Sequence, residues 1–501
     1  MALIVVACLG LASATCWAAP KEQKEMTDQQ ITRAVDHALL TDSALLNNQI
    51  DTKVNEGIVT LSGTANNLMT KERATKIAET IRGVRGVVNT IALKTISRSD
   101  DEIRKDVKSA LFYDAATDSY ELTPAVKDGV VTLSGTVQSY LEKQLAVHVA
   151  KGVKGVKEVK DSITVTLKSK RTDAEIAAEV KRAIAINVWL ATSFITTEVK
   201  DGVVTLTGTV GSSALHSQAS WLAWTAGVKS VNAEELKIEP WAKASGQRNE
   251  MNAFKGDPQI KQAVKDAFLY DPRVFSFNPI VEVENGVVTL TGVVDNLKAK
   301  RAAEQDAKNT VSVWRVKNLL KVRPVKAISD DELVKDVDSA FLRDSVVDSY
   351  QINVKAKNGV VTLTGTVDSY FEKALAEDIA SRANGVVNVK NNLAVSYPAL
   401  AYYDLGYDPY WAYPPFYYYW DQYRSPYYST RPYTSDAEVK NDIESQMFWS
   451  SWVDLDDITV KVVNGVATLT GTADSWSEYR AATSNAYEGG AIQVYNNITV
   501  R

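Results

Sequence analysis

Apolar residues recur with a helical period in six stretches of the chain. In each stretch they occupy positions i, i+4, i+7 and i+8, which lie on one side of an α-helix. The stretches begin at Ile31, Ile103, Ile176, Ile260, Leu333 and Val439, and the last follows the pattern least closely. A capping box precedes five of them, as Ser99 with Glu102 does, and Asp257-Pro258 precedes the fourth. The pattern predicts six amphipathic helices.

A short hairpin signature follows each predicted helix. The octamer NGVVTLTG occurs at residues 285–292 and again at 358–365, and near copies start at Glu56, Asp128, Asp201 and Asn464. Asn-Gly and Asp-Gly favour the type I′ turn, in which both central residues have positive φ. The predicted turn glycines are Gly57, Gly129, Gly202, Gly286, Gly359 and Gly465. The second glycine, as in Gly208, falls within the outgoing strand, where it predicts a bulge or a close helix contact.

A second helix and a closing strand complete each repeat. The closing strand has the signature Gly-Val-x-x-Val-x-Asn-x-Ile, which is clearest at residues 83–91. The fold class is therefore α+β, with six α-β-β-α-β units, each a three-stranded sheet with both helices on one face. The expected units are residues 26–95, 98–167, 171–239, 257–325, 328–396 and 435–501, with a linker at 240–256. We expect separate domains, and residues 98–167 should fold alone.

Two segments do not follow the repeat. Residues 1–18 are apolar or small and uncharged, which predicts a signal peptide; a lipoprotein leader is the alternative, because Cys16 lies nearby. Cys8 and Cys16 both lie in this region, so the remaining chain has no thiol chemistry or disulfides. Residues 397–434 are rich in Tyr and Pro. They are interpreted as an aromatic linker or, alternatively, an adhesive patch for self-association.

Charge differs between the units more than hydrophobicity does. The net charge of -5 gives the whole chain no attraction to nucleic acid. The second helices and following loops of units one, two and four are rich in cations, which are either a solvated helix face or patches for anionic lipid headgroups. The candidate lipid-binding residues are Lys71, Arg73, Lys76, Lys151, Lys154, Lys157, Lys160, Lys298, Lys300 and Arg301.

Residues that support catalysis do not converge in the sequence. The three histidines, His37, His148 and His216, belong to three different units, and each is interpreted as a surface residue. No metal-binding or phosphate-loop motif occurs, so we expect no catalytic residues, no metal and no cofactor. The acidic pairs at 100–101 and 330–331 lie in a first helical turn, where the helix dipole favours them.

The α-β-β-α-β unit, with its GVVTLxGxV hairpin and GVxxVxNxI closing strand, resembles the BON domain family. The resemblance implies a non-enzymatic, exported protein of the periplasm or cell envelope, with lipoprotein or outer-membrane attachment as an alternative. It also implies association with phospholipid surfaces or envelope proteins under osmotic stress. A periplasmic chaperone or protein-binding scaffold is the alternative function.

Overall fold

The computed structural model describes the chain between residues 26 and 500. The gaps are residues 43–44, 46–47, 118–119, 167–170, 191–192, 240–241, 243–255, 272, 275–276, 326–327, 348–350, 368–369, 396–434, 475 and 492. The predicted leader and the Tyr/Pro-rich insertion therefore lie outside the described residues, as does most of the linker at 240–256.

The first half of the described chain forms three units. Unit one contains α1 (Asp28–Thr41), β1 (Gln49–Asn55), β2 (Ile58–Ala65), α2 (Leu68–Thr80), β3 (Gly86–Asn89) and β4 (Ala92–Leu93). Unit two contains α3 (Asp100–Tyr113), β5 (Glu121–Lys127), β6 (Val130–Val137), α4 (Tyr140–Lys151) and β7 (Glu158–Val165). Unit three contains α5 (Asp173–Ile186), β8 (Phe194–Lys200), β9 (Val203–Val210), α6 (Ser213–Leu222), β10 (Ser230–Asn232) and β11 (Leu236–Ile238).

The second half repeats this order. Unit four contains α8 (Asp257–Tyr270), β12 (Ile280–Glu284), β13 (Val287–Thr291), β14 (Val293–Val294), α9 (Leu297–Lys308), β15 (Arg315–Asn318) and β16 (Lys321–Val322). Unit five contains α10 (Asp330–Arg343), β17 (Ile352–Lys357), β18 (Val360–Val367), α11 (Tyr370–Arg382) and β19 (Asn388–Val395). Unit six contains α12 (Asp436–Trp449), a 3-10 turn η7 (Leu455–Asp457), β20 (Ile458–Val463), β21 (Val466–Ala473), α13 (Trp476–Glu488) and β22 (Gln493–Val500).

Each sheet has the outgoing hairpin strand at its centre. In unit two, β6 pairs antiparallel with β5 and parallel with β7, and the other units repeat this arrangement. Alternate residues of the central strand, Val131 and Leu133, are fully buried beneath the helices, whereas Thr132 and Ser134 face away from them. The α+β fold class is thereby confirmed, with one apolar core in each unit.

The glycines of the hairpin have two different roles. Gly286 and Gly359 both have a φ of +73°, and each follows an asparagine with positive φ, as a type I′ turn requires. Gly208 has a φ of +114°, and a Cβ added there would lie 2.0 Å from the carbonyl oxygen of Phe194. The register runs through this position without an extra residue. The expected bulge or helix contact is therefore wrong, and the close neighbour is the adjacent strand.

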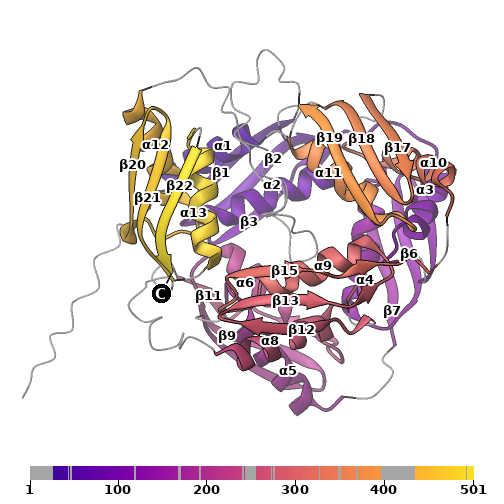
Figure 1. Ribbon diagram of the computed structural model, residues 1–501, viewed down its shortest axis with the longest axis horizontal. Helices are drawn as coiled ribbons and strands as arrows, with labels where there is room; N and C mark the ends of the chain where they lie inside the picture. The colour runs from indigo at the N-terminus through magenta and orange to yellow at the C-terminus, as the bar shows by residue number, and fades with distance from the viewer. Residues whose placement is uncertain are drawn as a thin grey trace, which may run out of the picture.

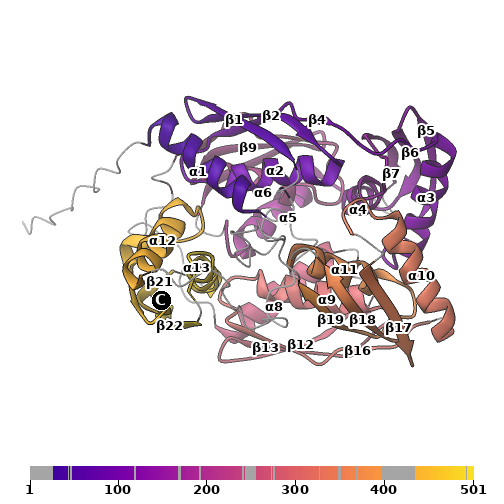
Figure 2. The same cartoon turned by 90° about the horizontal axis from the view of Figure 1, so that it is seen from above.

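The six units pack in two layers of three. Figure 2 shows units one to three across the upper part of the molecule and units four to six across the lower part. In the first layer, Lys151 of unit two forms an ion pair with Glu72 of unit one at 2.5 Å. Tyr140 of unit two stacks on Trp224 of unit three, with the ring centroids 3.7 Å apart. In the second layer, Arg301 pairs with Glu377 at 2.7 Å. Figure 1 shows the units alternating between the layers around a common axis, with their second helices turned inward.

Backbone bridges join the layers in three pairs of units. They link Ile81 to Ser450, Asn187 to Thr310, and Asp114 to Ala383, with a reciprocal bridge between Val153 and Asp344. Units one and six, three and four, and two and five are therefore paired across the layers. The same elements meet in each pair, namely the end of a first helix and the end of a second helix. The arrangement is closed and pseudo-symmetric, like an oligomer with dihedral symmetry.

The cores of neighbouring units are not fully separate. Leu68 of unit one belongs to the apolar cluster of unit two, and Leu297 of unit four belongs to that of unit five. A fragment of residues 98–167 would lose the contact with Leu68. Its independent folding stays a prediction, and we expect its stability to be modest.

Candidate functional site: charged junctions between the units

An aspartate at the start of each first helix holds the hairpin turn of its own unit. In unit two the Asp100 carboxylate accepts the backbone N–H groups of Asp128 and Gly129, both at 2.9 Å. These bonds lower the pKa of Asp100 below its ordinary value. The equivalent residues, each bonded to its own turn, are Asp28, Asp173, Asp257, Asp330 and Asp436. The first-turn acids therefore tie helix to hairpin, in addition to complementing the helix dipole.

A second polar position caps the C-terminal end of each first helix, and in units two, three, five and six it forms a backbone bridge to another unit. It is occupied by Asp42, Asp114, Asn187, Asp271, Asp344 and Ser450. In units two to six the side-chain oxygen accepts the backbone N–H two residues later, as Asp114 does from Ala116 at 2.9 Å. The side chain therefore turns the backbone at the point where it meets another unit.

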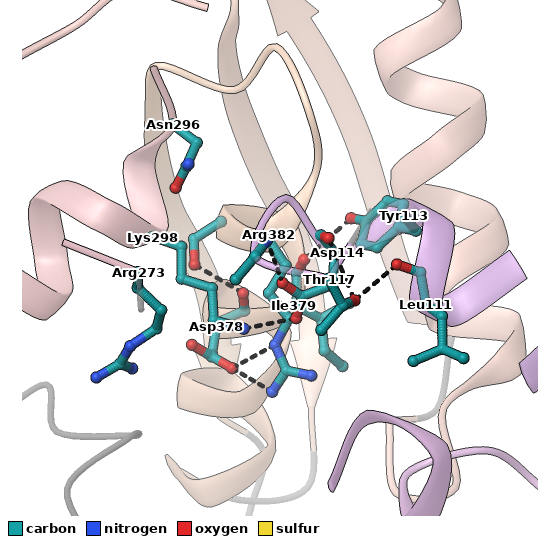
Figure 3. A network of polar contacts seen from close by, with 12 residues as sticks. Leu111, Tyr113, Asp114, Thr117, Arg273, Asn296, Lys298, Asp378, Ile379 and Arg382 are labelled. Atoms are coloured by element: carbon teal, nitrogen blue, oxygen red, sulfur yellow. Dashed lines mark hydrogen bonds and ion pairs between the residues drawn. The ribbon is translucent and has the colours of Figure 1, made fainter. Parts of the chain in front are cut away.

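The junction of units two, four and five gathers several of these charges. Asp114 at the end of α3 pairs with Lys298 of α9 at 2.5 Å, and both residues are almost completely buried. Nearby, Arg382 of α11 pairs with Asp378 at 2.5 Å, and the hydroxyl of Tyr113 donates to the carbonyl of Ile379 at 2.9 Å. Figure 3 shows these side chains converging from three different units. They form a buried polar network that fixes how the units dock.

The network shifts the pKa values of its members in physically consistent directions. Burial raises the pKa of Asp114, but the positive charges of Lys298 and Arg382 outweigh it and hold that pKa below the ordinary value. Burial lowers the pKa of Lys298, and Asp114 opposes this change. Burial and the neighbouring cations Arg382, Lys151 and Lys298 lower the pKa of His148 well below its ordinary value. At neutral pH the junction is an ion pair beside a neutral imidazole.

Unit four carries an acidic pair close to this junction. Asp271 accepts from the Arg273 side chain at 2.9 Å and from its backbone N–H at 2.8 Å. Burial and the neighbouring Asp271 raise the pKa of Asp306 well above its ordinary value. The site therefore favours the neutral, protonated form of the Asp306 carboxyl group over its anion.

The structure corrects the predicted lipid role of three cations on the second helices. Arg73 is buried and forms an ion pair with Asp42 of its own unit. Lys298 and Arg301 are buried at junctions with other units, against Asp114 and Glu377. These side chains cannot reach a membrane surface, because the second helices face the interior and their cations neutralise internal carboxylates.

The other predicted cations have mixed surroundings. Lys71 donates to the carbonyl of Ile91 at 2.7 Å, Lys76 pairs with Glu79, and Lys151 pairs with Glu72. The backbone N–H of Lys154 donates to Arg343 of unit five, and partial burial lowers the pKa of Lys300. Lys157 and Lys160, in and beside the closing strand of unit two, are exposed. Lipid contact stays a prediction for all seven of these residues, of which Lys157 and Lys160 are the exposed ones.

Two of the three histidines depart from the surface interpretation. His37 is exposed as expected, but His148 is half-buried at the junction and His216 lies 3.0 Å from the carbonyl of Ala233 through its Nε2. Among the described residues no group of three His, Cys, Asp or Glu side chains is placed to hold a metal ion. In the same part of the chain no helix is long and apolar enough to cross a membrane.

Sequence analysis missed the polar residue that ends each first helix. The signal was present, because Asp, Asn or Ser occurs three residues after the last apolar position of the stripe in every unit. Its partners could not be found in the same way. Asp114 and Lys298 are 184 residues apart in the chain.

Six small α+β domains, packed through charged junctions, define a tandem-repeat protein. The family model for the BON domain matches residues 27–95, 99–166, 172–240, 256–324, 329–397 and 435–501. The chain therefore belongs to the BON domain family.

One protein sequence and two solved structures are also similar to parts of this chain. The chain is 32% identical over 168 residues to the osmotically-inducible protein Y of Escherichia coli (strain K12). The matched region covers 32% of this chain and 84% of that protein. Two solved structures of CdsD, a structural protein of the type III secretion system of Chlamydia trachomatis, match 40% and 46% of this chain at 12% and 17% identity. They span 88% and 100% of their own chains, with TM-scores of 0.12 and 0.13, which carry no argument about this protein.

Proposed function

We propose that this protein is a non-catalytic, exported body of the bacterial envelope that associates with anionic phospholipid surfaces during osmotic stress. The similarity to an osmotically-inducible protein supports the stress role. One structural observation carries the lipid role. Several second-helix cations form ion pairs inside the molecule, whereas Lys157 and Lys160, in and beside the closing strand of unit two, are exposed at the outer surface.

The outward position of the sheets makes a weak, charge-driven contact the expected mode of binding. A Lys or Arg near an anionic membrane contributes about 1 kcal/mol, so a few exposed cations give an attraction of only a few kcal/mol. Salt should weaken this attraction, because screening acts over about 8–10 Å. Periplasmic localisation would place the protein beside two such membranes.

Co-sedimentation with vesicles tests this function. We expect the full chain to sediment with anionic vesicles and not with neutral ones, and to be released at high salt. Lys157→Gln with Lys160→Gln should reduce binding, whereas Lys76→Gln, which removes a cation paired to Glu79, should change it less. Binding that is independent of lipid charge and of salt would contradict the proposed mechanism.

A protein-binding scaffold or chaperone is the second candidate, and a different observation favours it. The last residue but one of the first helix has a large exposed apolar side chain in five units: Leu40, Phe112, Leu269, Leu342 and Phe448. Repeated exposed apolar groups are typical of surfaces that bind other proteins. Suppression of client aggregation that is lost in Phe112→Ser and Leu342→Ser, in the absence of any vesicle binding, would favour this candidate.

A further inference from the structure

The outer sheet faces of the six units provide an internal comparison. One position in the central strand follows the interior glycine, and it is threonine in five units but Val293 in unit four. A second position, on the incoming hairpin strand, holds Asp51, Thr123, Thr196, Ile280, Asn353 and Thr459 in units one to six. On the closing strand Ser162, Asn392 and Asn497 of units two, five and six correspond to Leu319 of unit four.

Unit four therefore replaces a polar row with an apolar one. Ile280, Val293 and Leu319 have relative exposures of 58%, 45% and 60%. Ile280 lies opposite Thr291. Leu319 directly follows β15, whose last residue, Asn318, lies opposite Leu290, so Leu319 falls on the other side of the same threonine. Val293 follows two residues along the central strand and lies opposite Lys321. The three side chains are neighbours on one face, which scattered surface residues would not be.

The charges on this face are sorted by strand. The closing edge of the sheet, along β15 and β16, carries four exposed cations: Arg315, Lys317, Lys321 and Arg323. The opposite edge strand carries Glu282 and Glu284. Within the described chain none of these four cations forms an ion pair with a carboxylate. Trp314, 39% exposed, lies at the end of the same edge and donates its indole N–H to the carbonyl of Asn285.

We propose that the outer sheet face of unit four is the surface through which the protein contacts an anionic phospholipid bilayer. The cations of β15 and β16 meet lipid phosphates, and Ile280, Val293 and Leu319 enter the boundary between headgroups and acyl chains. Trp314 is placed at the rim, where indole rings favour the membrane interface. This inference rests on the proposed function and assigns it to one of six similar faces. Figure 2 shows β12, β13 and β16 at the lower edge of the molecule, with α8 and α9 on the inner side.

A bilayer fits this face better than a second copy of the chain. A row of four cations repels the same row on another molecule. A stable protein interface buries about 800 Å² on each partner, which three apolar side chains of this size do not supply. An anionic bilayer has the opposite charge and needs no matching shape.

Site-specific labelling tests the proposal directly. Cys8 and Cys16 are the chain's two cysteines, so Cys8→Ser and Cys16→Ser give a full-length background for single labels. An environment-sensitive dye is attached at Leu319→Cys and, as the matched control, at Asn392→Cys in unit five. Vesicles of phosphatidylglycerol and phosphatidylcholine should shift the emission of the dye to the blue at residue 319 and leave it unchanged at residue 392. Equal shifts at the two positions would overturn the assignment to unit four.

Exchange of the polar and apolar rows gives a second test. The variant Ile280→Asn, Val293→Thr and Leu319→Asn carries the residues that unit five has at these positions, so the fold tolerates them locally. Separately, Lys317→Gln with Lys321→Gln should weaken vesicle binding about twenty-five-fold, since each surface cation contributes about fivefold. The triple polar variant at residues 280, 293 and 319 should bind vesicles more weakly at both low and high salt, because salt does not screen apolar contacts. Circular dichroism checks that this variant is folded.

The outcomes separate the two proposals. A wild-type chain that binds no vesicle of any composition overturns the proposed function together with this inference. A wild-type chain that binds, with polar and charge variants that bind equally well, overturns only the assignment to unit four. Vesicle-free self-association that the polar variant abolishes would assign the face to a second copy of the chain and overturn the lipid contact.

Discussion

Two equivalent junctions between units differ in what surrounds the buried aspartate at the end of the first helix. Asp114 ends the first helix of unit two and meets unit four, where it pairs with Lys298. Asp344 ends the first helix of unit five and meets unit one, whose Asn67 donates to the carbonyl of Ser345. The position equivalent to Lys298 holds Met69 there, and in the described part of the chain no cation lies within ion-pair distance of Asp344.

The pKa values of the two aspartates diverge accordingly. That of Asp114 is lowered, because Lys298 and Arg382 outweigh burial, whereas burial raises that of Asp344 despite backbone bonds from Val346 and Val347. Since both side chains make the same turn with their own backbone, the difference arises from the facing unit. One layer thus supplies a counter-charge that the other lacks. The predictions below test this contrast, and one of them compares the local folds of the two halves.

Lys298→Met makes the first junction like the second, and we expect the largest effect. It leaves Asp114 buried without its main partner, which should lower the free energy of unfolding by about 3–5 kcal/mol at neutral pH. The pKa of Asp114 should rise, so stability should be regained as the pH falls through that raised pKa. Denaturant unfolding between pH 4 and pH 8 measures both effects. Lys300→Met, on the same helix, is the control, and an equal loss there would contradict the role of the pair.

Gly208→Ala in unit three and Gly471→Ala in unit six change the same strand position in the two halves of the chain. They test whether equivalent units of the two halves have the same local fold. Each added Cβ would lie 2.0 Å from a carbonyl oxygen of the neighbouring strand, and both glycines have positive φ. We expect each change to lower the free energy of unfolding by about 2–4 kcal/mol. Urea denaturation of the two variants should give matching losses. A large difference would mean that the halves differ in their local folds as well as at their junctions.

Met69→Lys supplies the second junction with a cation. The pKa of Asp344 should fall below its ordinary value. The Asp344 carboxyl group should then stabilise the fold at pH values above its pKa in the unfolded chain, whereas in the wild type it does so at pH values below that pKa. The net gain should stay below about 2 kcal/mol, because burying two charges offsets much of their attraction. The pH dependence of unfolding, with Met69→Gln as the uncharged control, measures this. A profile identical to wild type would show that residue 69 does not face Asp344.

Asp344→Asn should have the smallest effect on the free energy of unfolding, and it should raise that free energy at neutral pH. Because the pKa of Asp344 is raised in the fold, the wild-type residue favours folding below its unfolded pKa, and this contribution is lost as pH rises through the folded pKa. The variant should be more stable at pH 7 by less than about 1 kcal/mol, with no gain below pH 4. Unit three already uses Asn187 at this position. Thermal unfolding at the two pH values measures the difference.

The sequence predicted the local features of each unit because their partners are close in the chain. All five predicted capping boxes are present, such as Ser99 with Glu102, and the α-β-β-α-β order is confirmed. The Asn-Gly signal follows from the φ that a tight turn imposes. These features depend on spacings of a few residues, which a pattern can reveal.

The placement of the charged side chains could not be predicted in this way. A cation on a helix gives the same pattern whether it faces solvent or a carboxylate of another unit. Arg301 and its partner Glu377 are 76 residues apart, and only the packing of units four and five brings them together. The apolar row of unit four was likewise hidden, because Ile280 and Leu319 become neighbours only when their strands pair across Thr291.

The pairing of units across the layers has a consequence for how the chain assembles. The pairs are nested: three with four, then two with five, then one with six. Unit four can dock on unit three as soon as it leaves the ribosome, and units five and six then close progressively longer loops around that first contact. No segment has to thread through a completed part. Synthesis from the N-terminus therefore delivers each unit when its partner is already folded, and the last unit made closes the body.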